Sequence, residues 1–164
     1  MPSNTQTFRK YLNPVFIETG SEQGYGIQQA IEVGFNRIFS IELNHASYLY
    51  CLKKYVQNKD VTLIHGDSSY VLGELLPVIN ECCTFWLDGH NIDSYPLIAE
   101  LDAIKQHHIK NHIILIDDLR MLDEQKHGLS TEILKKKILE INPDYNFSFE
   151  NGHIANDILV AYVN

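Results

Sequence analysis

The segment from Pro14 to Gly26 constrains the fold of this 164-residue chain more than any other. It opens on the apolar run Val15-Phe16-Ile17, becomes polar at Glu18 and then passes three glycines. From Ile27 onward, apolar residues recur with the spacing of an amphipathic helix. The segment therefore predicts a buried strand, a glycine turn and a helix. Such a turn lets a ligand approach the backbone closely, and the start of a helix offers free N–H groups.

The same alternation of strand and helix continues along the chain. Further strands are predicted at Arg37–Leu43, Val61–Ile64, Thr84–Leu87, Ile113–Ile116, Tyr145–Phe149 and Ile158–Val163. Most of these runs lack strict alternation, which favours a parallel sheet covered on both faces. Asn151-Gly152 predicts a hairpin between the last two strands. We expect one α/β domain over residues 14–164, a Rossmann-like, doubly wound, mostly parallel seven-stranded sheet with a C-terminal antiparallel hairpin strand. Residues 1–13 are expected to form a short arm or a lead-in helix.

Capping residues predict where several helices begin and end. Gly34 is a suitable stop for the first helix, and Asn44 is a suitable N-cap for the second. Ser68 or Ser69 is predicted to cap the third. A loop over residues 91–94 leads to a helix that begins near Pro96, because proline suits a first turn.

Composition limits the partners and the compartment. The net charge of −8 argues against a nucleic-acid partner, which needs a basic face. No apolar run approaches the roughly 20 residues of a membrane span, and Met1–Asn13 lacks a signal-peptide core, so no membrane partner is expected. Three cysteines without a Cys-x-x-Cys pair argue against a disulfide framework or a zinc site. These features favour a reducing, cytoplasmic location.

A carboxylate ends each of the five strands that are expected to be parallel. The five are Glu18, Glu42, Asp67, Asp88 and Asp117. Ligands of open α/β sheets bind at this edge, so we expect the acids to share one site. Glu42 could accept hydrogen bonds from both hydroxyls of a ribose, which S-adenosylmethionine and nicotinamide cofactors have in common. Glu18 would attract an ammonium group and repel a pyrophosphate, and the spacing Glu-x-Gly-x-x-x-Gly-x-Gly departs from the dinucleotide pattern G-x-G-x-x-G.

Asp88, Asp117 and Asp118 form the sharpest constellation. Two adjacent acids after one strand and one acid after its neighbour can converge on one point. Three carboxylates together suit Mg²⁺ or another hard divalent cation. Arg120, two residues beyond Asp118, is the one side chain that could take the place of the metal.

The motifs at Glu18–Gly26, Leu87-Asp88-Gly89 and Ile116-Asp117-Asp118 resemble those of class I S-adenosylmethionine-dependent methyltransferases. The glycine turn is similar to that of catechol and caffeoyl-CoA O-methyltransferases. The acid motifs are most similar to those of metal-dependent sugar O-methyltransferases of the macrocin and novobiocin type. The resemblance covers residues 14–164.

This resemblance implies a role for each candidate residue. The methionine part of the cofactor would face Gly20, Ser21 and Gly24, with its ammonium near Glu18. Glu42 would hold the ribose, and Asp67 with Ser68 the adenine amino group. Asp88 would border the cofactor and, with Asp117 and Asp118, hold the metal. His90 stands where the sugar enzymes carry an acidic general base, so it is either the base or a loop histidine without a role.

The expected function is O-methylation from S-adenosylmethionine, preferably of a sugar or glycan hydroxyl and next of a catechol. Two rivals of the same fold stay open, a nicotinamide oxidoreductase and a non-catalytic binding module. The segments around the acceptor site are short, so the site is either open or completed by a second subunit. We expect a homodimer, with an interface drawn from aromatic residues such as Phe8, Tyr11, Tyr48 and Tyr50.

Overall fold

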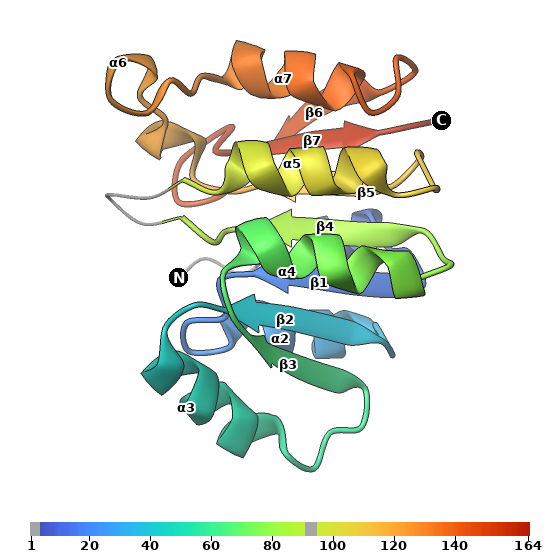
Figure 1. Ribbon diagram of the computed structural model, residues 1–164, viewed down its shortest axis with the longest axis vertical. Coiled ribbons are helices and arrows are strands. Elements are labelled where there is room, and N and C mark those ends of the chain that lie inside the picture. The colour runs from blue at the N-terminus through green and yellow to red at the C-terminus, as the bar shows by residue number, and fades with distance from the viewer. Residues whose placement is uncertain (1–3, 91–94) are drawn as a thin grey trace.

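One seven-stranded sheet organises the fold (Figure 1). The computed structural model describes residues 4–90 and 95–164, so the predicted loop over residues 91–94 lies outside the described residues. The strands are β1 (Val15–Thr19), β2 (Ile38–Glu42), β3 (Val61–His65), β4 (Cys83–Leu87), β5 (Ile113–Ile116), β6 (Asn146–Glu150) and β7 (Ile158–Tyr162). Their spatial order is β3-β2-β1-β4-β5-β7-β6. Strands β1 to β5 pair in parallel, and β7 pairs antiparallel with β5 and β6. The predicted fold class is confirmed.

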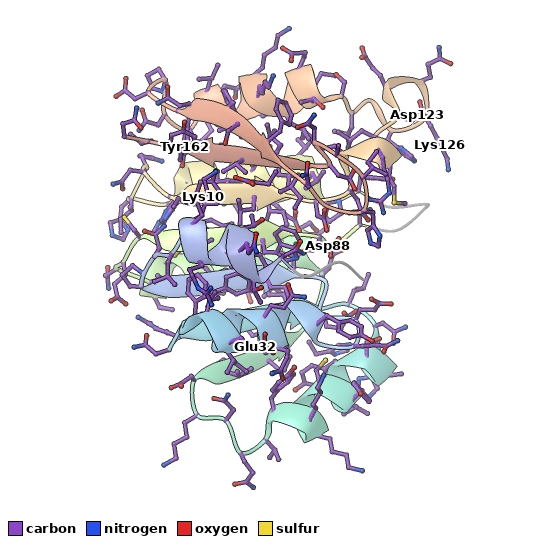
Figure 2. The ribbon with its side chains drawn as sticks, turned by 180° about the vertical axis from the view of Figure 1, so that it is seen from behind. Lys10, Glu32, Asp88, Asp123, Lys126 and Tyr162 are labelled. Atoms are coloured by element: carbon purple, nitrogen blue, oxygen red, sulfur yellow. The ribbon has the colours of Figure 1, made fainter. Side chains whose placement is uncertain are left out.

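Helices cover both faces of the sheet. Figure 1 shows in front α4 (Ser68–Leu75), α5 (Leu97–Gln106) and α7 (Thr131–Leu139). Figure 2, seen from behind, shows α1 (Thr5–Lys10), α2 (Tyr25–Val33) and α3 (His45–Tyr55). The short elements are η1 (Leu76–Val78), η2 (Leu119–Met121) and α6 (Glu124–His127). Each face of the sheet has its own cluster of buried apolar side chains, so the sheet is the middle of three layers.

The segment before β1 is a helix that packs on the sheet. Phe8 of α1 is fully buried, and its ring centroid lies 5.0 Å from those of Phe16 and Trp86. Tyr11 is also buried, and its hydroxyl donates to Glu150 at 3.0 Å. The prediction that Phe8 and Tyr11 face a second subunit is wrong, because both side chains fill the core of their own chain.

Two local predictions need correction. The N-cap of α4 is Asp67 and not Ser68 or Ser69, because Asp67 Oδ1 accepts from the backbone N–H of Ser69 at 2.9 Å. Strands β6 and β7 do form an antiparallel pair, but residues 151–157 connect them as a longer loop and not as a tight Asn151-Gly152 turn. By contrast, Asn44 caps α3 and Gly34 ends α2 with a positive φ of 98°, as predicted.

The strand order reverses at β1, which lies between β2 and β4. At such a switch point the two connecting segments leave in opposite directions, and a crevice opens at the carboxyl ends of the strands. The fold therefore directs a ligand to the residues that follow β1, β2 and β4. Among the described residues, no helix combines the length and the apolar character that a membrane crossing requires.

Candidate functional site

A pocket of about 780 Å³ lies at the carboxyl ends of the parallel strands. It is within the usual size range of small-molecule sites. Eight of the predicted residues line it, and they are Gly20, Glu42, Asp67, Ser68, Asp88, His90, Asp117 and Asp118. The structure therefore gathers four of the five strand-end acids in one pocket. The fifth, Glu18, lies outside this pocket.

The glycine turn brings the ends of β1 and β4 into contact. Gly20 has a φ of 83°, and a Cβ there would lie 2.5 Å from the backbone oxygen of Asp88. Only glycine tolerates both conditions. Gly24 also has a positive φ, but a Cβ there would meet the Tyr55 ring at 2.8 Å. Gly24 is not among the residues that line the two described cavities, and the space beside it is filled by Tyr55 and Cys51 of α3.

Glu42 is held rigidly at the end of β2. Its Oε2 accepts from the backbone N–H of Glu22 at 2.8 Å, and its Oε1 accepts from that of Asn44 at 2.7 Å. The side chain is 7% exposed and borders the pocket. A carboxylate oxygen has more than one lone pair, so each oxygen can still accept from a ligand hydroxyl.

Asp67 and Ser68 are partly engaged within the protein. Asp67 Oδ1 accepts from both the N–H and the hydroxyl of Ser69, the latter at 2.7 Å. Ser68 donates its hydroxyl proton to Glu100 Oε1 at 2.6 Å. Glu100 is fully buried beneath the pocket, and burial raises the pKa of its carboxyl to about 7. While its proton is given to an ionised Glu100, Ser68 can act on a ligand only as an acceptor.

Glu18 and Ser21 face the other side of the β1 turn. Ser40 donates to Glu18 Oε2 at 2.5 Å, and the hydroxyls of Ser21 and Ser40 lie 2.6 Å apart. Glu18 is 1% exposed, and burial raises the pKa of its carboxyl to about 8. Both residues border a second, much smaller hollow next to the main pocket.

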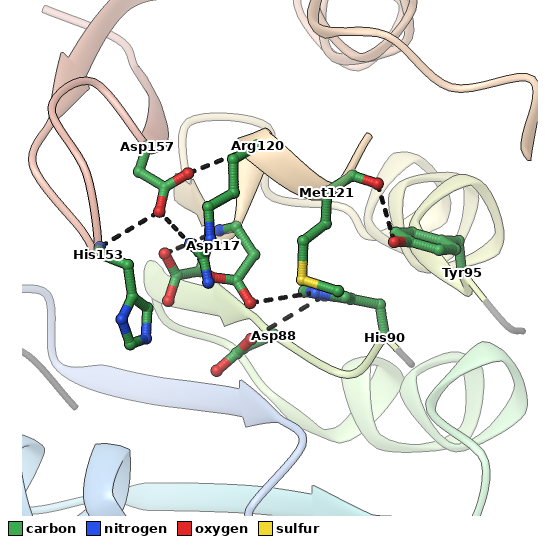
Figure 3. Close-up of polar contacts among 9 residues, drawn as sticks. Asp88, His90, Tyr95, Asp117, Arg120, Met121, His153 and Asp157 are labelled. Atoms are coloured by element: carbon green, nitrogen blue, oxygen red, sulfur yellow. Dashed lines mark hydrogen bonds and ion pairs between the residues drawn. The ribbon is translucent and has the colours of Figure 1, made fainter. Parts of the chain in front are cut away.

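The far end of the pocket carries an acid cluster around His90 (Figure 3). His90 Nε2 lies 3.3 Å from Asp118 Oδ2, and His90 Nδ1 lies 3.9 Å from Asp88 Oδ1. The imidazole is 4% exposed and stacks on the Tyr95 ring, with 5.2 Å between centroids. Asp118 has a φ of 57°, which is strained for a residue other than glycine and is typical of functional sites.

The charges in this cluster are unevenly distributed. Burial, and then the charges of Asp117 and Asp118, raise the pKa of Asp88 to about 9. Burial raises the pKa of Asp117 to about 6. Burial also acts to raise the pKa of Asp118, but the hydrogen bond from His90 and the charge of Arg120 outweigh it and hold that pKa below its usual range. Asp88 therefore holds a proton at neutral pH, and Asp118 is ionised.

Arg120 joins the cluster from η2. Its guanidinium forms ion pairs with both Asp118 and Asp157, and its backbone N–H donates to Asp157 Oδ1 at 3.1 Å. Asp157 also accepts from the backbone N–H of His153 at 3.2 Å. Figure 3 shows these contacts, with His153 extending from the loop between β6 and β7. Arg120 therefore places a positive charge beside Asp118 and Asp157, as the sequence suggested that it could.

Potential metal ligands form two overlapping groups among the described residues. In each group, one donor atom per residue lies within 4.8 Å of the others. One group is Asp88, His90 and Asp118, and the other is Asp117, Asp118 and Asp157. The predicted set of Asp88, Asp117 and Asp118 is thus divided between them. Asp117 Oδ1 accepts from the Asp118 N–H at 2.8 Å and faces the loop after β6.

Sequence reasoning missed Asp157 and His153. Both lie in the segment for which the sequence predicts a tight hairpin. A signal was present, because β7 runs antiparallel and its first residue therefore lies at the carboxyl edge of the parallel strands. An acid directly before β7 belongs at the same edge as the acids that follow β4 and β5.

Known structures share this fold. No protein-family model matches the sequence, and no curated protein does either. A Podospora anserina methyltransferase bound to SAH matches with a TM-score of 0.67 and 17% identity, over 98% of this chain and 76% of that one. A Bacillus cereus O-methyltransferase in complex with SAH matches with a TM-score of 0.67 and 12% identity, over 98% and 78%.

A Staphylococcus aureus protein, provisionally assigned as a caffeoyl-CoA O-methyltransferase, is also similar. Its TM-score is 0.65 and its identity 14%, over 98% of this chain and 80% of that one. At such identities the comparisons establish a common fold. The chain therefore has the α/β fold of these methyltransferases across nearly its whole length.

Proposed function

We propose that this chain is an S-adenosylmethionine-dependent O-methyltransferase that acts on a sugar hydroxyl with the help of a divalent cation. The observation that carries the proposal is the arrangement of one pocket across the switch point. A rigid carboxylate, Glu42, stands at the end of β2, and Asp88, His90 and Asp118 gather at the ends of β4 and β5. The solved structures of this fold that hold SAH support the cofactor.

The β1 turn disfavours a nicotinamide dinucleotide. A pyrophosphate at the turn would approach Glu22 and Glu42, which both border the pocket together with Gly20. Like charges at such short range are unfavourable unless a cation separates them. A sulfonium with an ammonium group brings positive charge to the same place. The charge of the pocket therefore favours S-adenosylmethionine over NAD.

The donor atoms fit a divalent ion in the group formed by Asp88, His90 and Asp118. Arg120 already neutralises the second group through Asp118 and Asp157, so the first group is the better candidate. A bound cation would displace the proton from Asp88. Two carboxylates suit Mg²⁺, and an imidazole in the set would also suit softer ions such as Mn²⁺. When bound, the ion would supply a Lewis acid that lowers the pKa of the acceptor hydroxyl.

The residues of the chain would then orient the acceptor and manage its proton. The methyl group passes from the sulfonium sulfur to the acceptor oxygen, and the hydroxyl proton leaves to water if His90 holds the ion, or to His90 if no ion is bound. In the second case Asp118, 3.3 Å from His90 Nε2, would stabilise the imidazolium that results. The stack on Tyr95 holds the plane of the imidazole. Alignment of two bound reactants supplies much of the rate enhancement in such a transfer.

One structural observation favours a second mechanism without a metal. Arg120 reaches Asp118, and His90 lies between Asp118 and Asp88, so the protein itself already places one cation and one imidazole in the cluster. In that case His90 acts as general base and Arg120 balances the carboxylate charge. A catechol would be an equally suitable acceptor for this arrangement.

Two experiments test the proposal. Titration calorimetry with S-adenosylmethionine and with NAD should give binding of the first only, and binding of NAD alone would overturn the class of enzyme. Methyl transfer from labelled S-adenosylmethionine should then be measured over sugars, nucleotide sugars and catechols, with EDTA and with added Mg²⁺ or Mn²⁺. Loss of activity in EDTA and recovery with the ion support the metal mechanism. Full activity in EDTA selects the mechanism based on His90 and Arg120.

A further inference from the structure

A second, much smaller hollow adjoins the main pocket behind the β1 turn. Its volume is about 20 Å³, enough for roughly one water-sized group. Its walls include Asn4, Glu18, Ser21, Gln29 and Trp86. It shares Gly20, Glu22 and Asp88 with the main pocket, so a ligand in that pocket can extend one small group into it. We call this space the Asn4 hollow.

Two acceptors on its walls are buried. Glu18 is 1% exposed, and among the described residues its side chain receives one hydrogen bond, from Ser40. Asn4 is 5% exposed, and its Oδ1 has no hydrogen-bond partner among the described residues. A buried carbonyl without a donor is unfavourable and rare in folded proteins. The hollow thus offers acceptors to a group that brings donors.

Asn4 is fixed in this position by the packing of α1. Its backbone N–H donates to Gln29 Oε1 of α2 at 2.5 Å. One turn later, Phe8 is buried against Phe16 and Trp86. The side chain of Asn4 makes no capping hydrogen bond to α1, although Asn4 occupies the N-cap position. Its carboxamide is therefore held at the hollow without serving the helix that follows.

We propose that Asn4 is a cofactor-binding residue, whose Oδ1 accepts a hydrogen bond from the ammonium group of S-adenosylmethionine in the Asn4 hollow together with Glu18. This inference rests on the proposed function. A primary ammonium has three donors and no acceptor, which matches walls that offer acceptors. It also carries the positive charge that favours the ionised form of Glu18, whose pKa burial alone raises to about 8. The helix before β1 would then be part of the cofactor site.

The test compares two variants of α1 with two ligands. Asn4→Ala removes the acceptor, and Gln6→Ala removes an amide from the exposed side of the same helix. Each variant is titrated with SAH, which carries the ammonium, and with 5′-methylthioadenosine, which lacks the whole amino-acid part. We expect Asn4→Ala to weaken SAH binding about tenfold or more and to leave 5′-methylthioadenosine unaffected, since hydrogen bonds to charged groups are the strong ones. Gln6→Ala should change neither affinity.

The remaining outcomes are distinct. Asn4→Asp, which keeps an acceptor, should bind SAH at least as tightly as the unaltered chain. Equal SAH affinity in Asn4→Ala and the unaltered chain would overturn the role of Asn4 and leave the proposed function intact. Equal weakening of both ligands would also overturn it, because it would mean that Asn4 only supports the shape of the pocket. An unaltered chain that binds neither ligand would overturn the proposed function and this inference together.

Discussion

His90 Nε2 lies 3.3 Å from Asp118 Oδ2, and this contact connects the loop after β4 to the strained residue after β5. The contact fixes which nitrogen of the imidazole faces an ionised carboxylate. The other nitrogen, Nδ1, faces Asp88. A histidine held in this way is suited to take a proton from a ligand bound in the pocket.

Replacement of His90 should therefore impair chemistry more than binding. We expect His90→Gln to lower the methyl-transfer rate by roughly 10²- to 10⁴-fold, the usual contribution of a general base. The affinity for S-adenosylmethionine should stay within about twofold, because Glu42 and the β1 turn are untouched. Single-turnover kinetics and calorimetry measure the two quantities. An unchanged methyl-transfer rate in His90→Gln would mean that His90 is a loop residue without a role in the reaction.

Glu42 should govern cofactor affinity. Glu42→Ala removes the carboxylate at the end of β2 and should weaken S-adenosylmethionine binding by more than tenfold, about 1.4 kcal/mol. Glu42 also anchors the N–H groups of Glu22 and Asn44, so Glu42→Gln, which keeps one acceptor, should lose less. Glu32→Ala, an exposed acid on α2, is the matched control. Unchanged affinity in a folded Glu42→Ala variant would remove Glu42 from the cofactor site.

The sheet was predictable because the residues within and directly after each strand carry a recognisable local pattern. Apolar runs, glycine turns and the acid after each strand fix the alternation, and β1 to β5 appear within about two residues of their predicted bounds. The pocket followed from the same rule, since acids at the ends of parallel strands share one edge. For this reason Glu42, Asp67, Asp88 and Asp117 all line it.

Side-chain direction was not predictable from position alone. Asp117 and Asp118 are adjacent, yet one faces the loop after β6 and the other faces His90. That difference depends on the positive φ of Asp118 and on Arg120 and Asp157, whose proximity is set by the long loop before β7. Whether Phe8 is buried in its own chain or faces a second subunit similarly depends on tertiary packing, because an aromatic residue in a short helix suits either a core or an interface.

The turn at Gly20 should be intolerant of any side chain. Gly20→Ala places a Cβ 2.5 Å from the Asp88 backbone oxygen and forces alanine to a φ of 83°. We expect a loss of about 2 kcal/mol or more in the free energy of unfolding. The control is Gly73→Ala on the exposed side of α4, where a Cβ meets nothing within 4 Å. Because alanine favours a helix, that variant should gain about 0.5–1 kcal/mol. Urea unfolding measures the free energy of unfolding of both variants. Equal changes in Gly20→Ala and Gly73→Ala would contradict the prediction.

We also propose that the chain forms a homodimer through α3. Several apolar side chains of this helix and its C-cap are largely exposed, and they include Leu49, Tyr50 and Val56. Val56→Lys should then shift a dimer toward monomer in sedimentation experiments. Val78→Lys is the matched control, because Val78 in η1 is 68% exposed and Val56 is 67% exposed. A monomer at high concentration of the unaltered chain would contradict the proposal, as would equal effects of the two substitutions.

The last prediction concerns a buried histidine pair at the opposite end of the sheet. The backbone N–H of Cys83 donates to His112 Nδ1 at 3.0 Å, and His112 Nε2 lies 2.8 Å from His107 Nδ1. His107 Nε2 in turn lies 2.9 Å from the carbonyl oxygen of Ile79. Two neutral imidazoles satisfy every contact in this chain, each donating from Nε2. A proton added at either Nδ1 would leave two donors facing each other.

Stability should therefore fall in acid. His112 is fully buried, and burial, followed by the charge of His107, lowers the pKa of His112 to about 4. In the unfolded chain a histidine has a pKa near 6.5. Between about pH 6.5 and 4, His112 is therefore protonated in the unfolded chain and neutral in the folded chain. The contribution of His112 to the free energy of unfolding is fully present above pH 6.5. It falls by roughly 3 kcal/mol in total as the pH drops from about 6.5 to 4.

A variant isolates this effect from the buried acids. Glu18 and Asp88 have higher pKa values in the folded chain than in the unfolded chain. Their protonation therefore makes the folded protein more stable as the pH falls, which opposes the effect of His112. The useful quantity is thus the difference between the unaltered chain and His112→Asn, measured by urea unfolding at pH 7 and at pH 5. We expect His112→Asn to be less stable at pH 7 and the gap to narrow at pH 5. A gap that stays constant between the two pH values would mean that His112 titrates alike in the folded and unfolded chain.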